Sequence, residues 1–147
     1  MSWIGENRAL SAIDWIEQNK PHDGEFIVYY KNEHWTATLD INESQMKNIR
    51  WKMYFKDGNR ADGPSYGYYC GGQIKQIINW KDNKMHGHLI RFYPNGMITD
   101  MNYYENGLEH GYWYHLLEDG RMINEGEFHY GERLWKKQHL DLNGKTC

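Results

Sequence analysis

The sequence has little of what secreted and membrane-spanning proteins require. Its 147 residues include only two cysteines, Cys70 and Cys147, which are too few for a disulfide framework and make free thiols in a reducing compartment the expectation. No run approaches the roughly 18 apolar residues that span a bilayer, and the first 20 residues lack a basic leader followed by an apolar stretch. We therefore expect a cytoplasmic protein with no membrane partner.

An excess of charge of one sign is also missing. Seventeen Lys and Arg residues are interspersed with 20 Asp and Glu residues, which gives a net charge of −3 and no basic block. Nucleic acid is therefore not expected as a partner. What the chain has in quantity is aromatic residues, at 16%. Tyr and Trp are amphipathic, so they suit half-exposed sheets and interfaces better than a deep closed core.

The beginning of the chain predicts one amphipathic helix. Apolar residues recur there at helical spacing, at Ala9, Leu10, Ile13 and Ile16. Pro21 ends the pattern, so the helix is predicted over about residues 6–19. We expect it to cover one face of a sheet, and the alternative is a helix that recruits another protein.

After Gly24 the apolar period changes from helical to two, which predicts strands. Residues 25–31 and 34–40 flank a short Asn32-Glu33 turn, and together they predict a β-hairpin. Residues 50–55 continue the alternation, with Trp51, Met53 and Phe55 on one side of the strand. The amino-terminal third therefore supplies a hairpin and one further strand.

The rest of the chain repeats with a period of 24 residues. Glycines recur at this interval, at Gly72, Gly96, Gly120 and Gly144, and three of the intervening runs begin at Gly63, Gly87 and Gly111. A second landmark, an aromatic residue followed three positions later by Gly or Asn, keeps the same register from Phe55 through Trp80, Tyr104 and Phe128. One residue is inserted between Gly58 and Gly63. The pattern predicts repeat units that start near residues 63, 87, 111 and 135.

The repeated glycines predict tight turns between strands. Five Asn-Gly or Asp-Gly pairs are present, at residues 57–58, 95–96, 106–107, 119–120 and 143–144. Such pairs tolerate the positive φ angles of a two-residue type I′ turn. The expected fold is therefore mainly β: a single antiparallel meander of β-hairpin repeats with one N-terminal helix. We divide this one structural domain into a helix and linker (1–24), a hairpin and connection (25–49) and the repeats (50–147).

The segments GHLIRFYPNG, YYENGLEHGYWYHLLEDG and EFHYGERL resemble the MORN-repeat variant. The resemblance covers roughly residues 50–147. It implies a fold of β-hairpin repeats and, because this variant is common in bacterial antitoxin-like proteins, it implies capture of a protein partner, for instance a toxin. The sequence departs from the pattern in four ways: Asn83 and Trp135 stand where glycines are expected, Gly71-Gly72 replaces Asn-Gly, and the last unit stops after its first turn.

Strand alternation divides the repeat side chains between two faces, if the turns have two residues. The face expected to pack on the helix carries Tyr69, Tyr93, Leu117, Ile74, Ile98, Met122, Trp80, Tyr104, Phe128, Leu89 and Trp113. Arg91 and Asp100 are predicted to form a cross-strand ion pair on it. The opposite face carries the residues that we expect to bind a partner: Tyr66, Tyr68, Phe92, Tyr103 and Tyr114. The alternative is that water covers this second face and the chain is a plain monomer.

The sequence nominates no catalytic, cofactor-binding or metal-binding residues. His86 and His110 occupy equivalent positions of neighbouring units, which lie about 9–10 Å apart in a meander, so they are predicted to flank turns rather than to share a metal. Ser65 lacks a nucleophile-elbow motif, and Cys70 has no evident histidine partner. We therefore expect neither a cofactor nor a metal ion.

These observations favour a non-catalytic protein-binding module that sequesters its partner, in the manner of an antitoxin or immunity protein, through an aromatic sheet face. Two alternatives stay open. The first is a self-assembling scaffold, of phage or viral kind, that extends through the edge of its last strand. The second is an enzyme or a small-ligand binder with a site between the helix and the sheet.

Overall fold

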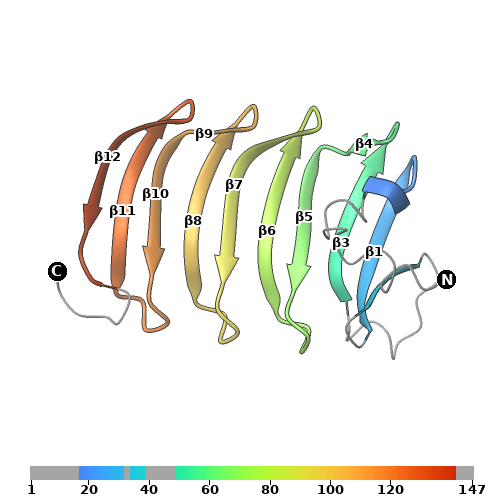
Figure 1. Cartoon of the computed structure of the whole chain (residues 1–147), viewed down its shortest axis with the longest axis horizontal. Coiled ribbons are helices and arrows are strands. Elements are labelled where there is room, and N and C mark those ends of the chain that lie inside the picture. The colour runs from blue at the N-terminus through green and yellow to red at the C-terminus, as the bar shows by residue number, and fades with distance from the viewer. Residues whose placement is uncertain (1–16, 32–33, 39–48, 142–147) are drawn as a thin grey trace.

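A computed structural model of the chain describes residues 17–31, 34–38 and 49–141. Twelve strands form one open antiparallel sheet that is a single layer thick (Figure 1). The described part of the chain is therefore mainly β, as predicted, and helix is confined there to residues 17–19. None of the described helical residues belongs to a helix that is long and apolar enough to cross a membrane.

The strands are two to nine residues long. They are β1 (Gly24–Lys31), β2 (His34–Thr38), β3 (Ile49–Lys56), β4 (Asn59–Arg60), β5 (Gly63–Tyr68), β6 (Ile74–Lys81), β7 (Lys84–Phe92), β8 (Ile98–Glu105), β9 (Leu108–Glu109), β10 (Gly111–Leu116), β11 (Met122–His129) and β12 (Glu132–Gln138). From β3 to β12 the strands follow one another in chain order; off this path, β4 pairs with β3 and β9 pairs with β8.

The amino-terminal elements lie at one end of this sheet (Figure 1). The predicted hairpin is confirmed as the antiparallel pair β1 and β2, with β1 next to β3 and β2 outermost. Residues 17–19 are helical, as predicted, whereas residues 6–16 of the predicted helix lie outside the described part of the chain. The Asn32-Glu33 turn and the Asn143-Gly144 pair also lie outside it.

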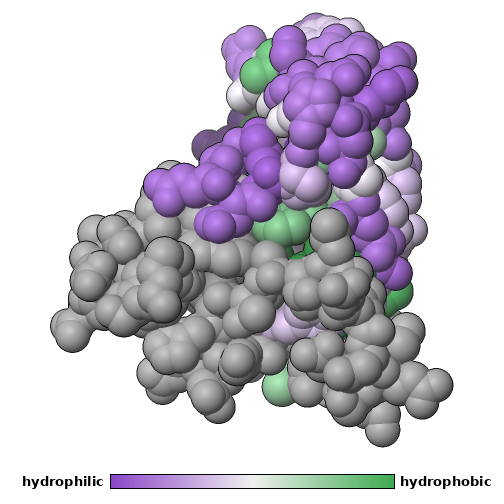
Figure 2. Space-filling model, turned by 90° about the vertical axis from the view of Figure 1, so that its right-hand side faces the viewer, coloured by the Kyte–Doolittle hydropathy of each residue, from purple (hydrophilic) through white to green (hydrophobic). Residues whose placement is uncertain are grey.

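The turns at the upper end of the sheet in Figure 1 have two residues with positive φ. This geometry holds at residues 57–58, 82–83, 106–107 and 130–131. The predicted type I′ turns are therefore confirmed at Asp57-Gly58 (φ 52° and 76°) and Asn106-Gly107 (φ 50° and 84°). This upper end is mostly hydrophilic (Figure 2).

The turns at the opposite end differ from the prediction. At Asn95-Gly96 and Asp119-Gly120 only the glycine has positive φ, 88° and 89° respectively. The amide of Tyr93 donates to the carbonyl of Met97, so this loop has three residues and its glycine is the left-handed residue of a bulge. The two-residue assignment at these turns was wrong.

Beyond a bulge the predicted strand register holds, because the bulge offsets the longer loop. Between the turn and the bulge it was wrong: Ile74, Ile98 and Met122 lie opposite Tyr68, Phe92 and Leu116 instead of Tyr69, Tyr93 and Leu117. Between β7 and β8 the register shifts at Arg91 and Phe92, and beyond that point Arg91 lies opposite Asp100. Their side chains form the predicted ion pair, with 3.0 Å between Nε and Oδ1. Both side chains belong to a solvent-accessible surface, so the pair contributes less than about 1 kcal/mol.

Hydrogen bonds join each upper turn to the preceding chain segment. The amides of Asp57 and Asp82 donate to the carboxylates of Asp23 and Asp62, both at 2.9 Å. The amides of Asn106 and Tyr130 donate instead to Nδ1 of His86 and His110, at 3.3 and 3.1 Å respectively. The two histidines therefore flank turns, as predicted, and each holds the next turn in place by accepting its first amide.

Replacing Asp62 by alanine is expected to lower the free energy of unfolding by about 1 kcal/mol, because the Asp82 amide loses its acceptor. Asp62→Asn is the matched control, since it keeps an oxygen at the same position and should cost less than half as much. Chemical denaturation measures both, and hydrogen exchange of the Asp82 amide should accelerate in the alanine variant alone. Equal losses in the two variants would contradict this role.

Complete burial is concentrated at the amino-terminal end of the sheet. Apolar residues with at most 5% exposure are Phe26, Ile27, Val28, Tyr29, Met53, Phe55 and Ile123, and all but the last belong to β1 and β3. Four consecutive buried residues in β1 mean that both faces of this strand are covered, because neighbouring side chains point to opposite faces. Most apolar residues of β6 to β10 are only half-buried.

Candidate functional site

The five aromatic residues predicted to bind a partner lie on one face of the sheet. Cross-strand pairs place directly opposite residues on the same face, and one continuous row of such pairs runs through Tyr66, Ile77, Ile90, Met101 and Tyr114. Tyr68, Phe92 and Tyr103 follow two positions along their strands from members of this row. We call this surface, with these five aromatic residues and the three aliphatic residues of the row, the tyrosine face.

The side chains of the tyrosine face are half-buried and contact one another. The rings of Tyr66 and Tyr68 have centroids 6.4 Å apart, and that of Tyr103 meets the ring of His88 edge-on at 5.1 Å. The Tyr114 hydroxyl lies 3.9 Å from the sulfur of Met101. Every one of the five predicted residues keeps part of its side chain accessible to solvent. The result is a continuous, accessible strip with an aliphatic centre.

Carboxylates lie at both ends of this strip. At one end, Glu25 forms a hydrogen bond with the Tyr54 hydroxyl. Burial raises the pKa of Tyr54, and this hydrogen bond raises it further. At the other end Glu125 accepts a hydrogen bond from the Tyr112 hydroxyl at 3.0 Å and lies 2.6 Å from Nε2 of His139. These hydrogen bonds, the one from His139 first, lower the pKa of Glu125. An aliphatic centre with a polar rim is the usual anatomy of a protein interface.

The opposite face carries three tryptophans, Trp51, Trp80 and Trp113, and we call it the tryptophan face. Two of them lie directly over a glycine of the neighbouring strand. A Cβ atom on Gly67 would come within 2.9 Å of the Trp51 ring, and one on Gly126 within 2.6 Å of the Trp113 ring. The indole nitrogens of all three are buried and have no hydrogen-bond partner among the described residues. The rings are therefore packed against the sheet rather than presented to a partner.

Tyrosines on the tryptophan face are tied to the neighbouring strand by their hydroxyl groups. The Tyr69 hydroxyl donates to the carbonyl of Phe92 at 2.6 Å, and the Tyr93 hydroxyl donates to that of Leu116 at 2.7 Å. Each bond joins two residues that are 23 positions apart in the sequence. The hydroxyl groups of Tyr69 and Tyr93 are thus used for bonds inside the sheet.

A stacked arginine joins the helical turn to the tryptophan face. The guanidinium of Arg60 lies 5.3 Å from the ring centre of Phe55 and 4.8 Å from that of Trp80, and 3.5 Å separates it from a carboxylate oxygen of Glu17. Burial lowers the pKa of Arg60, and Glu17 opposes this shift. Lys20 also approaches the Phe55 ring, at 5.8 Å. Glu17 and Lys20 therefore contact this face through charged side chains. The predicted apolar packing of the helix involves Ala9, Leu10, Ile13 and Ile16, which lie outside the described residues.

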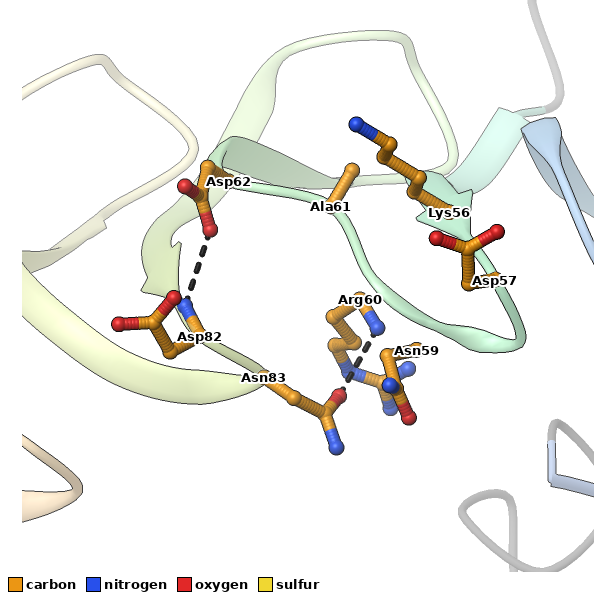
Figure 3. Close-up of a pocket in the computed structure, with 8 residues that line it drawn as sticks. All are labelled: Lys56, Asp57, Asn59, Arg60, Ala61, Asp62, Asp82 and Asn83. Carbon is orange, nitrogen blue, oxygen red and sulfur yellow. Dashed lines mark hydrogen bonds between the residues drawn. The ribbon is translucent and has the colours of Figure 1, made fainter.

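An open depression of about 580 Å³ lies beside the inserted residue of the β3–β5 connection (Figure 3). Its lining is polar and consists of Lys56, Asp57, Asn59, Arg60, Ala61, Asp62, Asp82 and Asn83. The presence of Asn83 where glycine is expected has a structural reason here. Its side-chain oxygen accepts a hydrogen bond from the amide of Arg60 at 2.8 Å and so fixes the inserted loop. Asn83 and the insertion, two departures from the 24-residue pattern, thus form one structural feature.

One group of possible metal ligands was not predicted from the sequence. His22, Asp23 and Asp57 bring ligand atoms within 4.8 Å of one another, and all three are exposed. Asp57 is 34 residues from Asp23, so no local sequence motif indicates the group. The oxygens of Asp23 are already engaged by the Asp57 amide and by Nδ1 of His22. Hydrogen bonds from these groups, the amide first, lower the pKa of Asp23. Asp23 therefore acts as a hydrogen-bond acceptor that holds the turn at residues 57–58 in place.

The two potential nucleophiles considered from the sequence differ in their exposure to solvent. Ser65 is buried in β5, with 5% exposure. Cys70 is exposed in the turn after β5. Among the described residues, neither forms a hydrogen bond or ion pair with a histidine or a carboxylate, the groups that activate such nucleophiles.

No protein-family model and no curated protein matches this chain. A solved structure, the Glycosylation Associate Protein (Gap123) complex from Streptococcus agalactiae, contains a chain that is similar to it at 17% identity with a TM-score of 0.37. The alignment covers 86% of this chain and 21% of that chain, so this chain spans about a fifth of the other's length. A likeness this distant identifies neither a family nor a function.

Proposed function

We propose that this protein is a non-catalytic binding module that holds a protein partner against the tyrosine face. The observation that carries the proposal is the continuous cross-strand row from Tyr66 to Tyr114, which gathers aromatic and aliphatic side chains from five strands. Large accessible patches of this composition are typical of interaction sites. The tyrosine hydroxyls and the carboxylates at its ends provide a polar rim.

The proposal includes a repeat architecture like that of the MORN-repeat variant. It is supported by local geometry that recurs at 24-residue intervals. The amide of Gly72 donates to the carbonyl of Tyr69, that of Gly96 to Tyr93, and that of Gly120 to Leu117, each at 2.9 Å. An antitoxin-like role in the cytoplasm, with a toxin as partner, would follow from this resemblance.

Two pairs of substitutions test the surface assignment. Tyr66→Ala with Tyr68→Ala, and Phe92→Ala with Tyr114→Ala, should each weaken binding of the native partner by at least about 100-fold, because aromatic side chains at the centre of an interface contribute 2 kcal/mol or more each. The partner is first isolated by affinity purification from the native host, and binding is then measured by calorimetry. Far-UV circular dichroism should stay unchanged.

The matched control removes an exposed apolar side chain next to a turn instead. Met97→Ala takes away a residue with 45% exposure that lies between the Asn95-Gly96 turn and β8, outside the tyrosine face. Its binding should equal that of the unmodified protein. Retained binding in both aromatic double variants, with the fold intact, would eliminate the tyrosine face as the binding surface.

A further inference from the structure

Strand β12 differs from the other strands in exposure and in its pairing. It ends the sheet, and among the described strands it pairs only with β11. All seven of its residues are exposed, whereas every residue of the central strand β8 is half-buried. An edge strand presents a row of backbone N–H and C=O groups that can pair with another chain. β12 is therefore a place where an extended segment could add to the sheet.

The charge of this edge is positive. Arg133, Lys136 and Lys137 carry three positive charges, and Glu132 carries one negative charge. Lys137 lies opposite Glu125, but Arg133 lies opposite Phe128 and Lys136 opposite Gly126. Neither Arg133 nor Lys136 forms an ion pair with any residue in the described ranges. Two cations are therefore left without a carboxylate at the open end of a protein whose net charge is −3.

These charges also limit what could pair with the edge. Two copies of β12 brought side by side would place like charges opposite one another, which destabilises a sheet. In addition, the register between β11 and β12 shifts at Leu134, and a bulge of this kind interrupts edge pairing. The regular part that remains is residues 135–138, with Lys136 and Lys137 on opposite faces of the strand. The edge thus disfavours a second copy and favours a segment of opposite charge.

We propose that β12 is a second docking surface, which takes an acidic extended segment of a protein partner as an added antiparallel strand. Backbone hydrogen bonds along residues 135–138 would supply affinity, and acidic side chains on both faces of the incoming strand would meet Lys136, Lys137 and Arg133. Trp135, with 41% exposure, adds an aromatic surface beside the same segment. The surface extends the proposed function and does not depend on the tyrosine face.

The test uses two synthetic seven-residue peptides with the same valine and threonine content, one with three glutamates and one with three lysines. Titration into the ¹⁵N-labelled full chain should give a dissociation constant about tenfold lower for the glutamate peptide, since a few cross-strand ion pairs make up that difference. The amide shifts should be confined to residues 132–138 and the adjacent strand. In the double variant Arg133→Glu, Lys136→Glu the preference should reverse.

A matched control changes the same number of charges elsewhere. Lys81 and Lys84 are an exposed cross-strand pair beside the β6–β7 turn, and their double replacement by glutamate should leave the peptide preference as it was. The Tyr66→Ala, Tyr68→Ala variant should also bind the glutamate peptide normally, which separates this surface from the tyrosine face. Equal affinity for the two peptides, shifts outside β11 and β12, or an equal effect of the control would overturn the proposal.

Discussion

Replacement of Gly126 by alanine is expected to lower the free energy of unfolding by about 3 kcal/mol, the upper part of the range for overpacking a well-packed site. A Cβ atom at this position would lie 2.6 Å from the Trp113 ring and 2.6 Å from the backbone oxygen of Trp135. The ring could turn aside, but the backbone oxygen belongs to the neighbouring strand. The methyl group can therefore be accommodated only if β11 and β12 move apart. Thermal or chemical denaturation measures the loss.

Gly67→Ala is the matched control for this prediction. Gly67 also lies beneath a tryptophan, but its closest neighbours, the Trp51 ring at 2.9 Å and the Gln76 side chain at 3.0 Å, are both side-chain atoms. Because side chains can shift without opening the sheet, the control should cost clearly less than Gly126→Ala. A Gly126→Ala protein as stable as the unmodified one would show that Trp113 and β12 do not pack as described.

Replacement of Phe55 by alanine should lower the free energy of unfolding by about 3–5 kcal/mol, the usual range for truncating a buried phenylalanine. Phe55 is 3% exposed and packs edge-on against Phe26, with 6.0 Å between ring centres. Arg60 and Lys20 also lie over its ring, so the substitution removes the ring contacts that hold the helical turn to the sheet. Urea denaturation followed by tryptophan fluorescence gives the value.

Phe92→Ala provides the comparison at the same residue type. Phe92 is half-buried on the tyrosine face, so its truncation should cost far less than that of Phe55. This difference is what allows the tyrosine face to be altered without unfolding the protein. Equal losses at the two positions would mean that the tyrosine face is part of the core and is not an accessible surface.

The sheet could be predicted from the sequence because its strands are local in the chain. Apolar alternation and glycine spacing identified successive hairpins, and they placed Arg91 opposite Asp100 correctly. The loop type at Asn95-Gly96 could not be predicted, since Asn-Gly fits both a two-residue turn and the end of a three-residue one. The bond from the Tyr93 amide to the Met97 carbonyl decides between them.

The features that escaped prediction depend on contacts between residues far apart in the chain. Asn83 departed from the glycine pattern without an evident reason until the structure placed its side chain against the Arg60 amide, 23 residues earlier. The stacking of Arg60 between Phe55 and Trp80 likewise joins separate strands. Sequence periodicity reports only which face a residue occupies, so it gave the members of the tyrosine face but not the depression or the basic edge.

The most direct test of the proposed function is site-specific photo-crosslinking in the native host at two adjacent positions of β8. Tyr103 belongs to the tyrosine face, and its neighbour Asn102 points to the tryptophan face, opposite Leu89. A photoreactive phenylalanine at position 103 should yield one discrete crosslinked protein that mass spectrometry identifies, and the same group at position 102 should yield none. Equal crosslinking at both positions, or none at position 103, would contradict a partner held against the tyrosine face.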